Sequence, residues 1–144
     1  MTLFLLNFIL PMIAAAASFI RNALLERIII ILSSIGLVIN NALFFMVPEP
    51  QETILVLMEV LDGYEIAFKL ESLSIIFALM VSILYLMTNL YSFAFLKGQE
   101  HSSLGRDLNP RIHFFFTPIA IMATICIGYS SNLLTLFVFY EILT

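Results

Sequence analysis

The sequence predicts an all-α membrane protein with four transmembrane helices, the start of a fifth, and a small outer β-hairpin between the second and third helices. Composition is the first observation, since 62% of the 144 residues are hydrophobic and only 11% are charged. A soluble domain has about 45–50% apolar and about 25% charged residues. The second observation is that the apolar residues form long, almost uncharged runs, which are typical of membrane-spanning helices. We therefore treat residues 1–144 as a single membrane domain.

The predicted spans are long apolar runs, and they cover residues 3–20, 28–47, 72–95, 112–129 and, truncated, 133–144. Pro11 and Pro118 interrupt the first and fourth spans, which a membrane helix tolerates when its neighbours bond the freed carbonyl. The fifth span reaches only about 18 Å at 1.5 Å per residue, against a hydrocarbon core of about 30 Å. We therefore expect the chain to be an incomplete, N-terminal portion of a larger protein.

The first span has an alternative interpretation as a cleaved signal peptide, because the run AAAA at residues 14–17 resembles a small-residue cleavage site. No Lys or Arg precedes the apolar run, however, and a signal peptide normally begins with a positively charged region. A retained first span is therefore favoured.

Loop charges predict the orientation of the chain. The loops after the first and third spans carry five basic residues, which are Arg21, Arg27, Lys97, Arg106 and Arg111. The loops after the second and fourth spans carry only Lys69. Because Lys and Arg are enriched in cytoplasmic loops, we expect the N-terminus on the outer side of a bacterial cell membrane or an organellar inner membrane.

The outer loop, residues 48–71, contains the predicted hairpin. The dipeptide Asp62-Gly63 favours a two-residue type I′ turn, because both residue types tolerate positive φ values. An apolar face is predicted for the strand that follows, and it consists of Tyr64, Ile66, Phe68 and Leu70. An isolated hairpin is only marginally stable in water. We therefore expect this one to lie on the outer helix ends or on a partner.

The other polar residues are interpreted as structural. The loop acids are expected to form a solvated face, although they could attract cations; they are Glu49, Glu52, Glu59, Asp62, Glu65 and Glu71. Cys126 is the only cysteine and is expected to be a packed thiol, whereas His101 and His113 are assigned to a loop or the membrane interface. Hydrogen bonds between helices are expected for Asn7, Asn40, Asn41 and Asn89.

Several kinds of site are absent from the sequence. It has no glycine-rich phosphate loop, HExxH motif, paired CxxC motif or nucleophile elbow. Its basic residues are too few and too scattered for a nucleic-acid surface. We therefore expect no cofactor, no metal, no nucleic-acid partner, and no redox or hydrolytic step performed by this chain alone.

Glu141 is the exception, because it lies in the apolar run NLLTLFVFYEILT. An acidic residue at the middle of a membrane helix costs about 2.5–3.5 kcal/mol, whereas one Leu or Phe contributes only about 0.3–0.6 kcal/mol. One interpretation is a proton-carrying group that faces a polar interior, where desolvation favours the neutral form and a nearby cation the ionised form. The other is a neutral acid bonded to another helix, or a residue near a helix end. No complete span carries Lys or Arg in its interior, so no pairing within the chain is evident.

Two segments resemble the antiporter-like membrane subunits of proton-pumping NADH:quinone oxidoreductase (respiratory complex I) and of Mrp-type sodium/proton antiporters. FKLESLSIIFALMVSILYLMTNLYSFAFLK is similar to their third-span region, typically F-x-hydrophobic-D-G-L-S. RIHFFF followed by YSSNLLTLFVFYEILT is similar to a block that typically reads S-N-N-L-L-hydrophobic-L-F-hydrophobic-F-W-E. The specific part of the resemblance covers residues 68–144.

The resemblance implies a role for Glu141, since the glutamate of the F-W-E block exchanges protons with a lysine on a later helix. It also implies partners, namely other membrane subunits, protons and possibly sodium. This chain departs from the pattern in having Glu71-Ser72 for D-G and Tyr140 for the tryptophan. The lysines of the family lie on helices beyond Thr144, so the chain is not expected to pump protons alone.

The sequence is therefore consistent with two functions. The first is the N-terminal portion of a proton-translocating, antiporter-like subunit, with Glu141 as the proton-transfer residue. The alternative is a small, non-transporting membrane scaffold or assembly protein that packs against a larger complex through its hairpin and helices.

Overall fold

The computed structural model describes residues 2–46, 53–61, 64–99 and 110–144. Its elements follow the chain in the order α1 (Thr2–Ala17), α2 (Ala23–Met46), β1 (Thr53–Leu61), β2 (Tyr64–Leu70), α3 (Ser72–Gln99), α4 (Pro110–Tyr129) and α5 (Leu133–Leu143). The structure is mostly helical, with one two-stranded antiparallel hairpin. The predicted class of helical protein with a hairpin is therefore confirmed.

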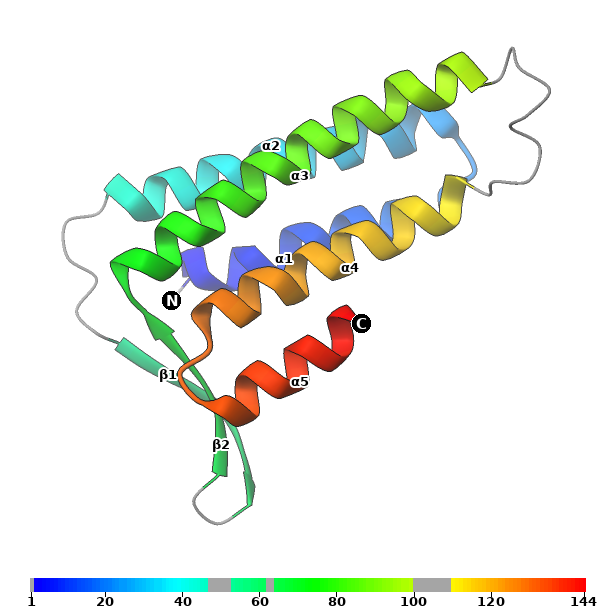
Figure 1. Cartoon of the computed structure of the whole chain (residues 1–144). Coiled ribbons are helices and arrows are strands. Elements are labelled where there is room, and N and C mark those ends of the chain that lie inside the picture. The colour runs from blue at the N-terminus through cyan, green and yellow to red at the C-terminus, as the bar shows by residue number, and fades with distance from the viewer. Residues whose placement is uncertain (1, 47–52, 62–63, 100–109) are drawn as a thin grey trace.

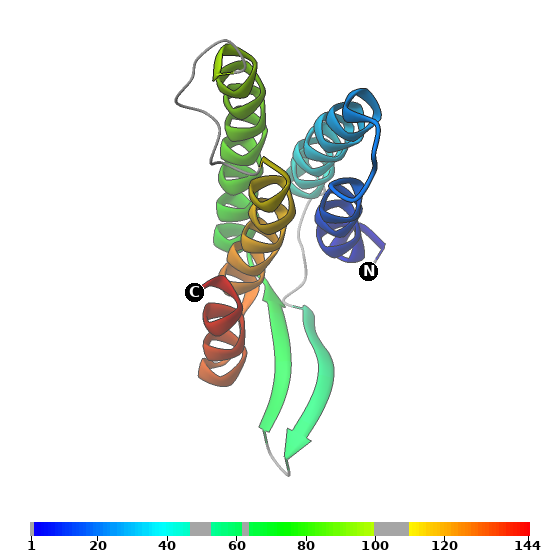
Figure 2. The same cartoon turned by 90° about the vertical axis from the view of Figure 1, so that its right-hand side faces the viewer.

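The first four helices form an antiparallel bundle (Figure 1), in which α1 packs on α2, α2 on α3, α3 on α4 and α4 on α1. α5 packs outside this ring, against α4 and β2. The hairpin projects from the end of the bundle where α1, α3 and α5 begin (Figure 2). We call this the hairpin end.

Three helices, α2, α3 and α4, are long and apolar enough to cross a membrane. α1 and α5 are shorter apolar helices, so the predicted count of four complete spans is not confirmed. α1 ends at Ala17, beyond which the amides of Ser18, Phe19 and Ile20 each donate to a carbonyl three residues earlier. Its 16 residues extend about 24 Å at 1.5 Å per residue, which is shorter than a hydrocarbon core of about 30 Å.

α2 and α3 extend furthest beyond their predicted limits. α2 begins at Ala23, before the predicted residue 28, because Asn22 caps it: the Leu24 amide donates to Asn22 Oδ1 at 3.1 Å. α3 continues to Gln99, past the predicted residue 95. The charged ends of these runs are therefore helical, although the sequence analysis assigned them to connections.

Aromatic side chains join the hairpin to the helices. Phe68 of β2 is completely buried, and its ring centroid lies 5.3 Å from that of Phe4 in α1 and 5.5 Å from that of Phe139 in α5. Phe4 in turn lies 5.6 Å from Tyr129 of α4. The hairpin thus lies on the helix ends, which is one of its two predicted positions.

The prediction of a single apolar face on the second strand of the hairpin is incomplete. Ala67 alternates with Phe68 along β2, yet it too is buried, because α5 covers that side of the strand. Both faces of β2 are therefore covered at this point, rather than one apolar face alone. The predicted turn, Asp62-Gly63, lies outside the described residues.

Asparagine side chains link α1 to α2. Asn40 Nδ2 donates to the Leu3 carbonyl at 2.9 Å and to Asn7 Oδ1 at 3.0 Å. These bonds confirm the interhelical role predicted for Asn7 and Asn40. Asn41 and Asn89 are also buried, but neither makes an interhelical hydrogen bond among the described residues.

Gly128 marks a close approach between α4 and α3. A Cβ atom there would lie 2.4 Å from Cδ1 of Phe77, whereas a Cβ atom at Gly36 of α2 would meet Leu10 at an ordinary 3.4 Å. We expect Gly128→Ala to displace the Phe77 ring and to lower the free energy of unfolding by about 1–3 kcal/mol. Gly36→Ala, the matched control, should be neutral or slightly stabilising. Thermal unfolding in detergent compares the two, and a Gly128→Ala protein as stable as the control would refute the close packing.

Candidate functional site

Glu141 lies on α5, whose start is fixed by an N-cap. Asn132 has an extended backbone, with φ −142° and ψ 164°, and its side chain accepts a hydrogen bond from the Thr135 amide at 2.8 Å. Such a cap satisfies one of the amides left without a partner in the first turn of a helix. The turn at residues 130–132 therefore determines where α5 begins.

β2 holds this start of α5 through four hydrogen bonds. The Ser131 amide and hydroxyl both donate to the Ala67 carbonyl, at 3.0 and 2.9 Å. The Ala67 amide donates to Thr135 Oγ1 at 3.0 Å, and Asn132 Nδ2 donates to the Glu65 carbonyl at 2.6 Å. We call these five residues the hairpin clamp, because together they fix the position of α5 on the bundle.

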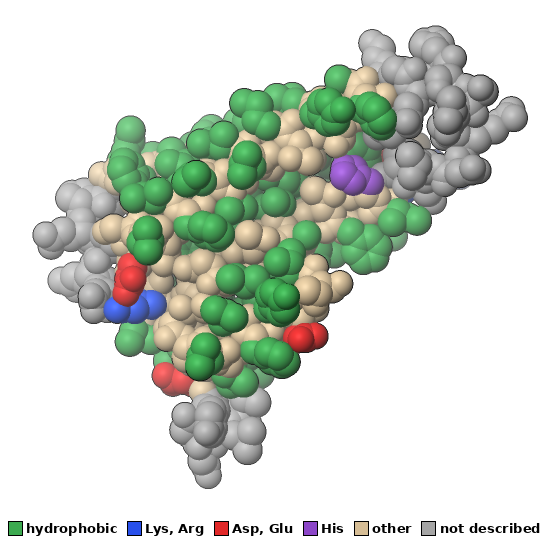
Figure 3. Space-filling model, viewed as in Figure 1, with side chains coloured by type: hydrophobic (Ala, Val, Ile, Leu, Met, Phe, Trp, Pro, Cys, Tyr) green, Lys and Arg blue, Asp and Glu red, His purple; other side chains and the backbone are tan. Residues whose placement is uncertain are grey.

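The two faces of α5 have different surroundings. Thr135 and Phe139 lie four residues apart, so they share one face, and both are buried. Glu141 is two residues beyond Phe139, which places it on the other side of the helix. That side is exposed and otherwise apolar, with Phe137 59% and Tyr140 51% exposed. Hydrophobic side chains also dominate the surface around α5 in Figure 3.

The C-terminal end of α5 lies beside the middle of α4 (Figures 1 and 2). Glu141 is eight residues past Leu133, which corresponds to about 12 Å along the helix at 1.5 Å per residue. Within the described part of the chain, no Lys, Arg or His forms an ion pair with Glu141. The structure thus places Glu141 on an apolar, outward face, at a distance from the bundle end. The polar interior expected around a proton-carrying Glu141 is not formed by the described residues of this chain.

The other polar residues lie apart from Glu141. His113, exposed in the second turn of α4, has its Nε2 3.1 Å from Ser92 Oγ of α3. Cys126 is buried with a free thiol, as predicted. Among the described residues, no group of three or more His, Cys, Asp or Glu could hold a metal ion. His101 lies outside the described residues.

The acidic loop is only partly described. Glu59 and Glu65 are exposed on the hairpin, as expected for a solvated face. Glu71 forms an ion pair with Lys69. The remaining three acids, Glu49, Glu52 and Asp62, lie outside the described residues.

The sequence analysis did not predict the hairpin clamp, since it left residues 130–132 outside the fourth and fifth spans. A local signal was present, because an Asn directly before an apolar run, as Asn132 is, is typical of a helix N-cap. The bonds to β2 had no such signal, since Ala67 and Thr135 are 68 residues apart in the sequence.

Comparison with known proteins leaves the family of this chain open. No family model matches it, and no curated protein matches it at a significant level. The function must therefore be argued from the residues and their arrangement.

Proposed function

We propose that this chain is the N-terminal portion of a proton-translocating, antiporter-like membrane subunit of the complex I or Mrp type, in which Glu141 carries the proton. The observation that carries the proposal is the position of Glu141, on an apolar outward face of a helix that the hairpin clamp holds in place. A carboxylate costs about 2.5–3.5 kcal/mol in a membrane helix, and ionisable residues there are functional by default.

Glu141 can accept and release a proton, but it cannot drive the cycle alone. A cation on a neighbouring helix favours the ionised carboxylate, and withdrawal of that cation favours the protonated acid. The three long helices carry no Lys or Arg in their interiors, so the cation is assigned to a helix of another part of the assembly. Such a helix would cover the face of α5 that carries Phe137, Tyr140 and Glu141.

The charges of the described residues support an orientation with the hairpin on the outer side. Arg21, Arg27 and Arg111 lie at the end of the bundle opposite the hairpin, where α1 ends and α2 and α4 begin. The hairpin end carries acidic residues in excess over Lys69. Because basic residues favour the cytoplasmic side, the proposal places the N-terminus outside, in a bacterial cell membrane or an organellar inner membrane.

A second candidate is a non-transporting scaffold, and the exposed apolar side chains of β1 favour it. Large hydrophobic side chains on this strand are more than half exposed, and they are Ile54, Val56, Leu57 and Met58. The neighbouring strand β2 is already covered by this chain, since its Phe68 and Leu70 side chains are buried. A partner of the scaffold would therefore dock on β1, rather than on the apolar face of β2 that the sequence suggested.

One crosslinking experiment separates the two functions. A photoreactive benzoyl-phenylalanine replaces Phe137, beside Glu141, or Val56 on β1, and the native membrane is irradiated. The transport proposal predicts that the group at position 137 captures an apolar helix that contains a lysine. Capture of lipid alone at 137, together with protein at 56, would instead support the scaffold. Exposed Leu24 at the opposite end of the bundle is the control position.

A further inference from the structure

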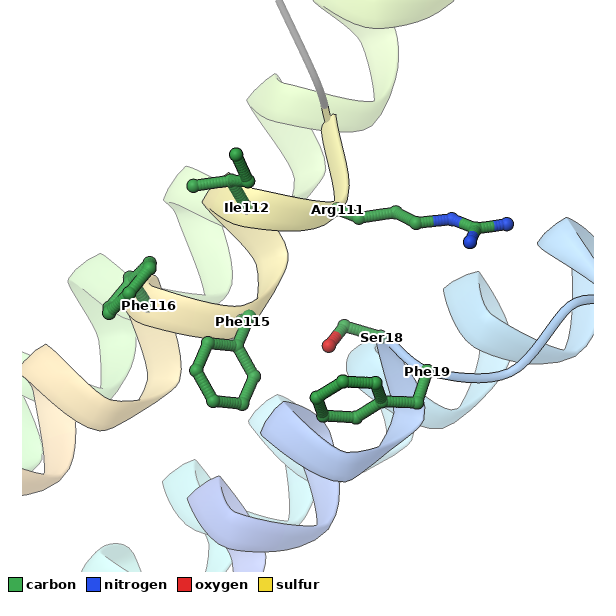
Figure 4. A pocket seen from close by; sticks show the side chains of 6 residues that line it. All are labelled: Ser18, Phe19, Arg111, Ile112, Phe115 and Phe116. Atoms are coloured by element: carbon green, nitrogen blue, oxygen red, sulfur yellow. The ribbon is translucent and has the colours of Figure 1, made fainter.

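A pocket of about 300 Å³ lies between the end of α1 and the start of α4, at the end of the bundle opposite the hairpin (Figure 4). The side chains that line it are mainly aromatic or aliphatic with one cation, and they are Ser18, Phe19, Arg111, Ile112, Phe115 and Phe116. Its volume is at the lower limit of about 300–1,000 Å³ for small-molecule sites. It can therefore hold a head group or part of a chain, but not a whole lipid.

The walls of the pocket are apolar and face the surroundings of the helices. The rings of Phe19 and Phe115 meet edge to face, with their centroids 5.3 Å apart. Phe116 and Ile112 are 60% and 57% exposed, and they lie on α4, which is long and apolar enough to cross a membrane. Acyl chains are the apolar groups that such a surface meets in a bilayer.

The rim of the pocket is positively charged. Arg111 lies in the first turn of α4, and its guanidinium extends past Ser18 and Phe19 toward the start of α2 (Figure 4). There it interacts with Glu26, as does Arg27. Arg21 is exposed in the connection between α1 and α2. The described side chains in this region thus include three arginines and one carboxylate, of which Arg27 and Arg111 interact with Glu26, so positive charge is in excess.

We propose that this pocket binds an anionic phospholipid, with the phosphate at Arg111 and the upper part of an acyl chain against Phe19, Phe115 and Phe116. A guanidinium matches a phosphate by two parallel hydrogen bonds. Basic pockets between helices at the cytoplasmic boundary are suited to anionic head groups. A lipid in this position bridges the ends of α1 and α4, where α1 stops short of the full thickness of the membrane.

Native mass spectrometry of the detergent-solubilised protein tests this proposal, with phosphatidylglycerol and phosphatidylcholine of identical acyl chains as probes. One cation near a membrane surface contributes about 1 kcal/mol, so the wild type should bind phosphatidylglycerol about fivefold more tightly. Arg111→Gln should remove this preference, whereas Lys69→Gln, which removes a positive charge at the hairpin end, should retain it.

Equal binding of the two lipids by the wild type would overturn the proposal, whether or not the variants fold. Competition by soluble glycerol phosphate as effective as that by the lipid would also overturn it, because the site would then recognise phosphate without an acyl chain. Arg111→Lys keeps the charge but not the paired donors, and it should retain part of the preference.

Discussion

Phe68→Ala is expected to lower the free energy of unfolding by about 3–5 kcal/mol and to release the hairpin from the helix ends. The Phe68 side chain is completely buried, and its ring contacts those of Phe4, Phe8 and Phe139. Removal of this ring leaves a cavity where β2, α1 and α5 meet, and an isolated hairpin has little stability of its own.

The matched control for Phe68→Ala is Ile54→Ala, on the neighbouring strand of the same hairpin. Ile54 is 56% exposed, so its truncation should change the free energy of unfolding by less than about 0.5 kcal/mol. Thermal unfolding in detergent measures the stability of both variants, and limited proteolysis reports release of the hairpin. If both variants unfold at the same temperature, the aromatic cluster is not what fastens the hairpin.

The hairpin also matters for the candidate site, because the hairpin clamp joins β2 to the start of α5. Phe68 and Ala67 are adjacent in β2, so a change that loosens one affects the hydrogen bonds of the other. Loss of these bonds would free the N-terminal end of α5. The position of Glu141, on the same short helix, therefore depends on the packing of Phe68.

The helices and the hairpin could be predicted from the sequence because their signals are local. Long apolar runs predicted α2, α3 and α4, and alternation of apolar residues predicted β2. The end of α1 could not be predicted in this way. Its apolar run continues to Ile20, but the backbone changes at Ala17 to bonds between residues three apart. Composition does not distinguish these two backbone conformations.

The candidate site was predictable only in part. Glu141 could be selected because the cost of a carboxylate in an apolar run depends on the sequence alone. The outward direction of Glu141 depends on contacts between distant segments. These contacts attach the start of α5 to β2, through the hydrogen bonds that Ser131 and Thr135 make with Ala67. These contacts follow from the docking of β2 on α5, which no local pattern specified.

Glu141→Gln is expected to lower proton flux through the assembly about a hundredfold or more, since loss of a positioned proton-transfer group typically costs 10²–10⁴-fold. Glutamine is similar in size to glutamate but cannot carry the proton, so packing on the outward face of α5 is preserved. Glu141→Asp keeps the carboxyl group on a shorter side chain, and it should retain part of the flux.

The matched control is Glu65→Gln on the hairpin. The Glu65 side chain is exposed, and only its backbone carbonyl takes part in the hairpin clamp. Its substitution therefore removes one carboxylate of the chain without changing α5. Proton flux in this variant should equal that of the wild type.

The most direct test is proton uptake by liposomes that contain the native assembly, with an internal pH-sensitive dye, at equal amounts of assembled protein. If Glu141 carries the proton, Glu141→Gln assembles normally and loses its flux, while Glu65→Gln keeps it. A Glu141→Gln assembly that takes up protons at the wild-type rate would show that Glu141 does not carry the proton.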